Sequence, residues 1–133
     1  ARRAHAATNA PLSQLVDGTR AFVAYLFEQK AWSRIHVRSQ ISWAMRPQGK
    51  VAGELWDAGQ NAHAEMLSAG AASGVFHDDD PAEMALMIRA MTRVQVVNAI
   101  EQGETDCEAI ADRLIERLLR MVCKNTVLVQ EAG

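Results

Sequence analysis

The stretch from residue 74 to residue 122 constrains the fold most, because it contains two helix start signals, each followed by a long run with helical periodicity. In the first, Asp80 is a typical N-cap residue, Pro81 suits the first helical position, and a glutamate lies three residues after the cap. We expect this helix to end at Gly103. Thr105 is the second start signal, again with a glutamate three residues later. The sequence therefore predicts two long helices folded back on each other.

Apolar residues recur at three- and four-residue steps in three segments before this pair, at residues 11–30, 33–45 and 51–72. Pro11 suits the start of the first segment, and Pro47 follows the end of the second. Alanine is abundant and there are only three prolines, a composition that favours helix throughout. We therefore expect an all-α fold, an antiparallel bundle of five to six helices over residues 11–124. Residues 1–10 are expected to be the end of a linking helix or a disordered lead, and residues 125–133 a tail.

The last two helices carry more apolar surface than one subunit core requires. Within residues 106–124, one apolar side comprises Ala111, Leu114, Leu118 and Met121, and an adjoining side comprises Ile115, Leu119 and Val122. A helix that packs on one neighbour needs only one such stripe. Two stripes on each of the last helices predict burial inside the subunit and again across a dimer axis, in a four-helix bundle with two helices from each subunit.

Length and charge narrow the classes of protein. A chain of 133 residues predicts a single domain. Its net charge of −2 gives no bulk attraction to nucleic acid or to an anionic membrane. No apolar run reaches the roughly 18 residues of a membrane span, and the first residues lack the apolar segment of a signal peptide. Cys107 and Cys123 are about 24 Å apart on one expected helix, at a rise of about 1.5 Å per residue, which is too far for a disulfide. They predict free thiols and a cytoplasmic location.

Motifs of catalysis are missing from the sequence. None of the four histidines has the His-Glu-x-x-His or Glu-x-x-His spacing that places metal ligands on one helical face. There is no Gly-x-Ser-x-Gly elbow, phosphate-binding Gly-Lys-Ser/Thr or dinucleotide fingerprint. The run Asp78-Asp79-Asp80 lacks EF-hand spacing and is better explained as a solvated loop that caps a helix. We therefore expect no enzyme activity, no catalytic residue, no metal and no cofactor, but a binding module.

Three of the expected helices leave two interpretations open. In residues 33–45 and just before them, two tryptophans bracket a histidine and small polar groups, which fits either a core edge or the wall of a ligand cavity. Residues 51–72 contain glycines inside a helix, each costing about 1 kcal/mol relative to alanine, which indicates close packing or a cavity. Methionines line one stripe of residues 81–102, and methionine suits either an ordinary core or a pocket for varied shapes.

The order of these signals resembles the C-terminal ligand-binding and dimerisation domain of TetR-family transcriptional repressors. The resemblance covers about residues 11–122 and rests on a helix ending near Ala69-Gly70, the segment Gly74-Val75-Phe76, the Gly-x-x-x-x-Asp-x-Pro junction of Gly74, Asp79 and Pro81, and two long helices. It implies a homodimer held by a four-helix bundle, and a pocket for a small hydrophobic or aromatic effector. It also implies that effector binding controls operator DNA through an N-terminal helix-turn-helix domain. The present sequence lacks that domain, so DNA binding is expected only of a longer parent protein.

Carried over residue by residue, the resemblance implies two sets of functional residues. The ligand-binding set lies on three helices and comprises Trp32, His36, Gln40, Trp43, Trp56, Gln60, His63, Met87, Met91, Gln95 and Asn98. The set facing the partner subunit comprises Leu86, Ala90, Val94, Val97, Ile115, Leu119 and Val122. Which stripe of each of the last two helices faces the dimer axis stays open. The tryptophans and polar groups would suit a flat or bulky hydrophobic ligand with one or two hydrogen-bonding atoms.

Three hypotheses from different classes follow. The chain is a ligand-sensing and dimerising regulatory domain, a helical dimerisation module without a ligand, or a helical enzyme that depends on a metal. The first predicts a stable dimer, a cavity of roughly several hundred Å³ and a melting temperature that rises with a hydrophobic compound. A filled core would favour the second hypothesis, and a metal bound by His36, His63 and a carboxylate would favour the third.

Overall fold

The computed structural model describes residues 2–29 and 46–124, with side chains from residue 10 onward. Over these residues the chain is helical apart from short connections, so the predicted all-α class is confirmed. The helices are α1 (Arg2–Glu28), α3 (Lys50–Ala72), α4 (Pro81–Glu101) and α5 (Cys107–Val122). The helix expected at residues 33–45, the tail from residue 125, and the candidate ligand residues Trp32, His36, Gln40 and Trp43 lie outside the described residues.

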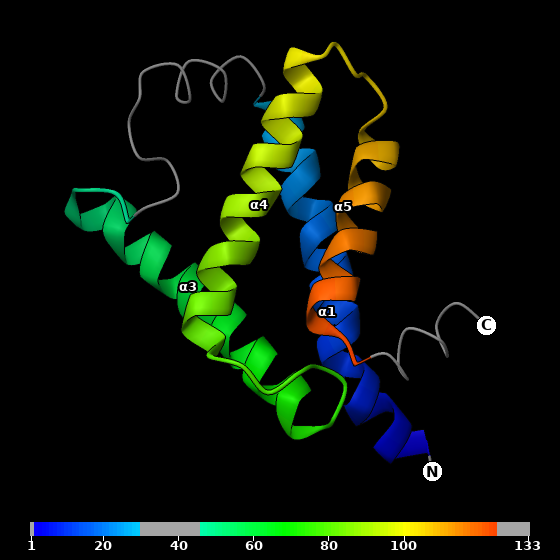
Figure 1. Cartoon of the computed structure of the whole chain (residues 1–133). Helices are drawn as coiled ribbons and strands as arrows, with labels where there is room; N and C mark the ends of the chain where they lie inside the picture. The colour runs from blue at the N-terminus through cyan, green and yellow to red at the C-terminus, as the bar shows by residue number, and fades with distance from the viewer. Residues whose placement is uncertain (1, 30–45, 125–133) are drawn as a thin grey trace.

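Three helices lie side by side and the remaining one crosses their end (Figure 1). α1 packs against α5 and α4, while α3 slants across and packs against α4 and α1. Apolar side chains of the four helices meet between them. Fully buried side chains there include Val23 of α1, Ile88 and Val96 of α4, and Leu114 and Leu118 of α5. Two ion pairs also join α1 to α5, because Arg20 reaches Glu108 at 3.1 Å and Asp112 at 2.7 Å.

The first helix begins earlier than expected. The sequence predicted a start at Pro11, whereas α1 begins at Arg2 and carries Pro11 inside it. Proline favours the first turn because it has no N–H to donate, but inside a helix it removes one backbone hydrogen bond. Pro11 and Leu12 are both buried, and so is Leu15 one turn later. The helix therefore continues through Pro11 where the side chains around the proline are buried.

The start of α4 is as predicted, and the start of α5 differs by one residue. The Oδ1 atom of Asp80 accepts hydrogen bonds from the N–H groups of Ala82 at 3.0 Å and Glu83 at 3.1 Å, with Pro81 at the first helical position. α5 is capped by Asp106, which accepts from the Ala109 N–H at 3.1 Å, and not by Thr105. Aspartate and threonine are both good caps. Because Thr105 and Asp106 are adjacent, the sequence predicted the cap one residue too early. Gly103 ends the α4 region with a φ of 80°, as expected for glycine after a helix.

The junction between α3 and α4 holds the end of α5. Phe76 and Cys123 form an isolated antiparallel bridge, the His77 N–H donates to the Val122 carbonyl at 2.8 Å, and the Lys124 N–H donates to the Val75 carbonyl at 3.2 Å. Val75 and Phe76 are each 1% exposed. The Gly-Val-Phe segment therefore closes the bottom of the core and ties α5 to the α3–α4 connection.

Cys107 and Cys123 form no disulfide with each other, as predicted from their separation along α5. Cys107 begins α5 and Cys123 follows its last residue, where it is buried. None of the helices in residues 2–29 and 46–124 has the length and apolar character needed to cross a membrane.

Candidate functional site

Trp56 of α3 is the centre of a cluster that includes the basic side of α4. Its side chain is 9% exposed, and the guanidinium carbon of Arg89 lies 4.0 Å from the centre of its ring. A guanidinium at this distance over tryptophan makes a favourable cation–π contact. The Nη1 atom of Arg89 also donates to the Trp56 carbonyl and to Oε1 of Gln60, each at 3.4 Å. The stacked Trp56 and Arg89 side chains thus join α3 to α4.

A second arginine extends the cluster to α1. Arg93 lies one turn after Arg89, with its guanidinium carbon 5.5 Å from the Trp56 ring centre and 5.6 Å from that of Phe22. Three helices therefore meet here, since Phe22 belongs to α1, Trp56 to α3 and both arginines to α4. The four-residue spacing places both guanidiniums on the same side of α4.

The cluster contains two positively charged side chains, Arg89 and Arg93. Partial burial lowers the pKa of Arg89, and partial burial together with the charge of Arg89 lowers the pKa of Arg93. Arginine nevertheless stays protonated at neutral pH. No carboxylate of the described residues lies within ion-pair distance of Arg89. Asp57, the acidic residue next to Trp56, instead pairs with Arg46 at 2.9 Å.

Gln60 and His63 complete the α3 side of the cluster. The Nε2 atom of Gln60 donates to the Ala82 carbonyl in the first turn of α4 at 2.7 Å, which orients its oxygen towards Arg89. His63 is half-buried, and its Nδ1 lies 3.3 Å from the Gly59 carbonyl. Burial lowers the pKa of His63, the hydrogen bond to Gly59 opposes this, and the charge of Arg89 lowers it further. The neutral imidazole is therefore favoured beside the arginines.

The structure brings together only part of the predicted ligand-binding set. Trp56, Gln60 and His63 share one side of α3, as predicted. On α4, Met87 is 53% exposed, Asn98 is exposed and Met91 is half-buried. Gln95 bonds to α5, accepting from Arg117 Nη1 at 2.8 Å and donating to the Ile110 carbonyl at 3.5 Å.

The α4 residues that do meet Trp56 are Arg89 and Arg93, which sequence reasoning had not assigned to the site. Met87 is two residues from Arg89, about 200° around a helix at about 100° per residue. The α4 half of the predicted set therefore does not share the Trp56 side of the helix. Two arginines one turn apart on α4 were the available signal.

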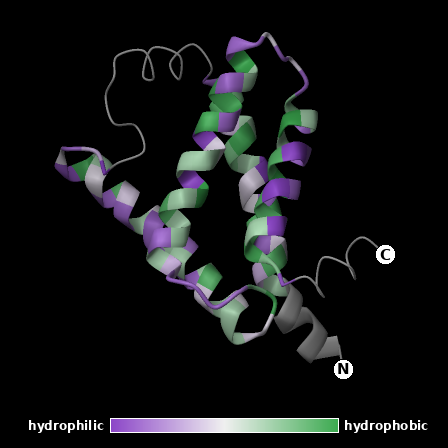
Figure 2. Ribbon diagram, viewed as in Figure 1, coloured by the Kyte–Doolittle hydropathy of each residue, from purple (hydrophilic) through white to green (hydrophobic). Residues whose placement is uncertain are grey.

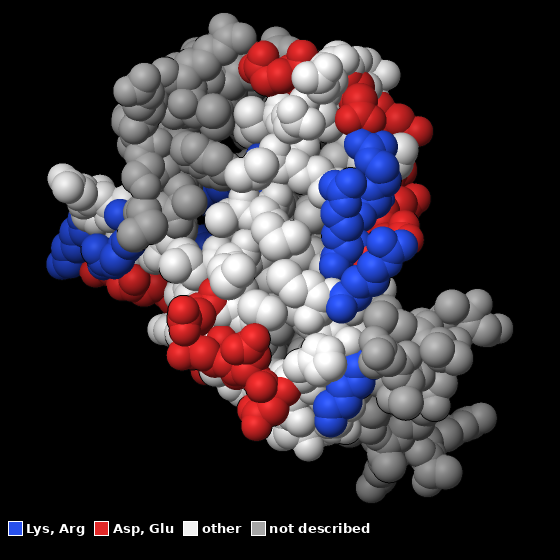
Figure 3. All heavy atoms as spheres, viewed as in Figure 1, with Lys and Arg blue, Asp and Glu red and all other residues white. Residues whose placement is uncertain are grey.

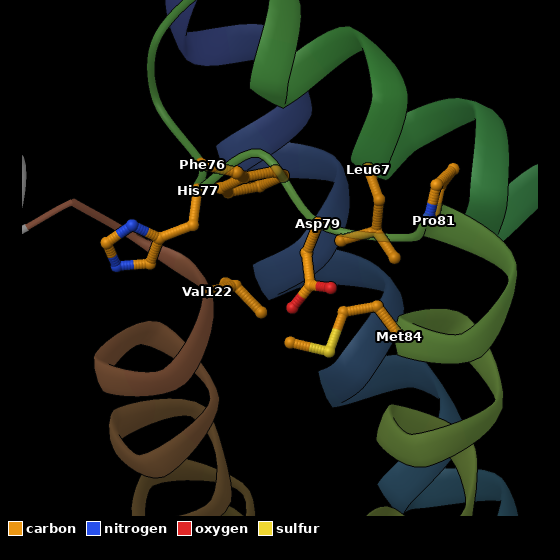
Figure 4. A pocket seen from close by; sticks show the side chains of 7 residues that line it. All are labelled: Leu67, Phe76, His77, Asp79, Pro81, Met84 and Val122. Atoms are coloured by element: carbon orange, nitrogen blue, oxygen red, sulfur yellow. The ribbon is translucent and has the colours of Figure 1, made fainter.

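A small pocket lies at the other end of α3, below the core. It is lined by Leu67, Phe76, His77, Asp79, Pro81, Met84 and Val122 (Figure 4). Its volume of about 10 Å³ holds one water molecule at most. In Figure 4 the His77 ring points away from the other labelled side chains. The pocket contains none of the residues predicted to bind a ligand, and it is too small for an effector.

The outer side of α4 is apolar although it does not face the core. Residues of high hydropathy run along the length of this helix (Figure 2). Val94 is 56% exposed, and Leu86 and Ala90 are half-buried. Val97 is buried but does not belong to the main core cluster. In Figure 3 an uncharged surface over α4 lies beside a column of basic residues on α5, where Arg113, Arg117 and Arg120 are exposed.

The residues of α5 predicted to face a partner are used within the subunit. Ile115 and Val122 are 8% and 2% exposed and belong to the core, and Leu119 is half-buried against it. Both apolar sides of α5 therefore pack inside this chain, and its outer side is charged. Among the residues predicted to face a partner, the most exposed one therefore lies on α4, where Val94 is 56% exposed.

Metal-ligating side chains are scattered among the described residues. In residues 10–29 and 46–124 no three histidine, cysteine, aspartate or glutamate side chains come together in a way that would hold an ion. Comparison with known proteins returned no matching family profile, no matching curated protein and no matching solved structure.

Proposed function

We propose that this chain is the effector-sensing and dimerisation domain of a TetR-like transcriptional regulator. In this proposal a small ligand binds beside Trp56 between α3 and α4, and two copies of the chain associate through α4. A helix-turn-helix domain elsewhere in a longer cytoplasmic protein contacts operator DNA and responds to the ligand. The support comes from the sequence resemblance, the all-helical arrangement and the two sides of α4.

The observation that carries the proposal is that α4 has an apolar side in the core and another apolar side open to solvent. Ile88 and Val96 are at most 2% exposed, whereas Val94 and Met87 on the outer side are more than half exposed. Burying apolar surface is worth about 25 cal/mol per Å², which drives association of subunits as well as folding. Exposed apolar surface rimmed by charges is typical of protein–protein contacts, and the basic column on α5 forms such a rim.

The test of dimerisation is a charge placed at the centre of the outer side of α4. We expect Val94→Glu to lower the molar mass in light scattering from that of a dimer towards that of a monomer, because an unpaired carboxylate would be buried at the contact. Val51→Glu is the matched control, since Val51 is 71% exposed in the first turn of α3. It should remain dimeric. Equal masses for both variants and the unmodified chain would exclude this side of α4 as the contact.

A ligand-free dimerisation module is the second candidate. It is favoured by the small volume of the pocket in Figure 4, which leaves no room for an effector there. Such a module would dimerise through α4 in the same way. It would be distinguished by a melting temperature that no apolar or aromatic compound raises, because a ligand that binds only the folded state must stabilise it.

A further inference from the structure

We propose that a second copy of the chain packs on α4 in the opposite direction, so that Glu83 of each copy faces Arg117 of the other. This inference rests on the proposed dimer, and it specifies the orientation of the two α4 helices and the charges that select it. Glu83 and Arg117 are exposed side chains that take no part in the Trp56 cluster.

Glu83 lies at the beginning of the outer side of α4. It comes eleven residues before Val94, which places the two side chains about 20° apart around a helix at about 100° per residue. Met87 and Ala90 fall between them at steps of four, three and four residues, the spacing of one continuous helix side. No cation of the described residues lies within ion-pair distance of Glu83. The outer side of α4 therefore begins with a carboxylate and continues with apolar residues.

Arg117 of α5 lies beside the other end of the same outer side. Its Nη1 atom donates to Oε1 of Gln95 at 2.8 Å, which ties the guanidinium to α4. Arg113 and Arg120 of the same basic column pair with glutamates of this chain. For Arg117, no carboxylate of the described residues is within ion-pair distance. Its charge is therefore available to a carboxylate from outside the chain.

These opposite charges make one face of the molecule complementary to itself. Figure 3 shows acidic side chains near the start of α4, basic side chains along α5 and an uncharged surface between them. Glu83 and Gln95, which holds Arg117, are about 18 Å apart along α4 at a rise of about 1.5 Å per residue. In a dimer that joins this face to itself, a twofold axis lying in the face and crossing α4 midway between the two positions exchanges them. Each Glu83 then faces Arg117 of the partner subunit, and the two α4 helices run in opposite directions.

The centre of this arrangement is small and apolar. The axis crosses α4 close to Ala90, whose methyl side chain lets two helices approach closely. Val94 then lies over Met87 of the partner subunit, so the exposed apolar side chains cover each other. A parallel arrangement would instead place Glu83 against Glu83 of the partner subunit and bring the two Arg117 side chains together. Because like charges across an interface are costly, the charges select the opposite orientation.

The experiment reverses each charge and measures the dissociation constant of the dimer by sedimentation equilibrium at low ionic strength. We expect Arg117→Glu and Glu83→Arg each to raise the dissociation constant roughly ten- to a hundredfold, because each variant dimer contains two like-charge contacts across the axis. An equimolar mixture of the two variants should dimerise within about threefold of the unmodified chain. In the mixed dimer, both acidic positions of one variant face both basic positions of the other, so recovery is specific to contacts between subunits.

Lys50→Glu and Glu54→Arg are the matched controls, because these exposed residues lie at the start of α3, away from α4 (Figure 1). They change the net charge as the two test variants do and should leave the dissociation constant within about threefold. Circular dichroism establishes that each variant is folded. If Glu83→Arg is not folded, added salt decides, since screening should weaken the dimer of the unmodified chain and strengthen that of Arg117→Glu.

Each alternative outcome identifies which claim fails. Unchanged dissociation constants in both charge reversals, a mixture that dimerises no better than its separate variants, or the same response to salt with and without Arg117→Glu would overturn the proposed orientation. A dimer that Val94→Glu still dissociates would then remain in place. An unmodified chain that is monomeric at every concentration would overturn both the orientation and the dimeric sensor.

Discussion

At the scale of single residues, Gly70 decides how the α3–α4 junction closes. A Cβ atom built on Gly70 would lie 2.0 Å from Cδ2 of the Phe76 ring, a distance that no real side chain tolerates. Phe76 is 1% exposed and is held at both ends of its backbone by the cap of α3 and the bridge to Cys123. The ring has nowhere to retreat, so only glycine fits.

We expect Gly70→Ala to lower the free energy of unfolding by about 1–3 kcal/mol, the usual cost of overpacking a core. The same substitution at Gly18 is the control, because no atom lies within 4 Å of the Cβ built there. Gly18 is inside α1, so Gly18→Ala should stabilise by up to about 1 kcal/mol. Urea unfolding at one fixed protein concentration measures both. If both substitutions change the free energy of unfolding equally, or if Gly70→Ala raises it, Phe76 does not press on α3.

His63 makes stability depend on pH. Burial lowers its pKa in the folded chain below the ordinary value of histidine, about 6.5, so the unfolded chain binds more protons as pH falls through this region. The free energy of unfolding should therefore decrease as pH falls from about 6.5 to the lower pKa of the folded state. Above about pH 6.5 this group should not affect the free energy of unfolding. His63→Gln should flatten this part of the profile. Urea unfolding between about pH 7.5 and 5 measures it, and an identical slope in the variant would contradict the assignment.

At the scale of elements, local chemistry predicted helix ends well and helix orientation poorly. The cap of α4 was predictable because Asp80 and Pro81 act only on their own turn. The start of α1 was not, because tertiary burial around Pro11 overrides the proline signal. Trp56, Gln60 and His63 were placed on one face by spacing alone. Spacing does not say which neighbour each side of an apolar helix meets, so Met87 and Gln95 were assigned to the site in place of Arg89 and Arg93.

The cap of α4 also carries a prediction. Asp80→Ala should lower the free energy of unfolding by about 1 kcal/mol, because the Ala82 and Glu83 N–H groups lose their acceptor. Asp78→Ala removes an exposed carboxylate from the same loop without removing a bond to a described residue, and it should change stability by less than about 0.5 kcal/mol. Chemical denaturation of both variants compares them. If the two losses are equal, the cap contributes only through its charge.

At the scale of the whole molecule, α4 connects the two proposed activities. One of its sides is core, the next carries Arg89 and Arg93 to Trp56, and the outer side carries Val94 and Met87. A ligand that draws Arg89 towards itself would act on the same helix that contacts the partner subunit. Coupling between ligand and dimer geometry then needs no long pathway, because one rigid element serves both sites.

The molar mass of the unmodified chain in solution tests this account most directly, measured by light scattering on a size-exclusion column over a range of protein concentrations. With α4 buried against a second copy, the mass should be twice the 14.6 kDa of one chain. It should fall towards 14.6 kDa only on dilution or in Val94→Glu. A mass of one chain at every concentration, unchanged by Val94→Glu, would contradict the account.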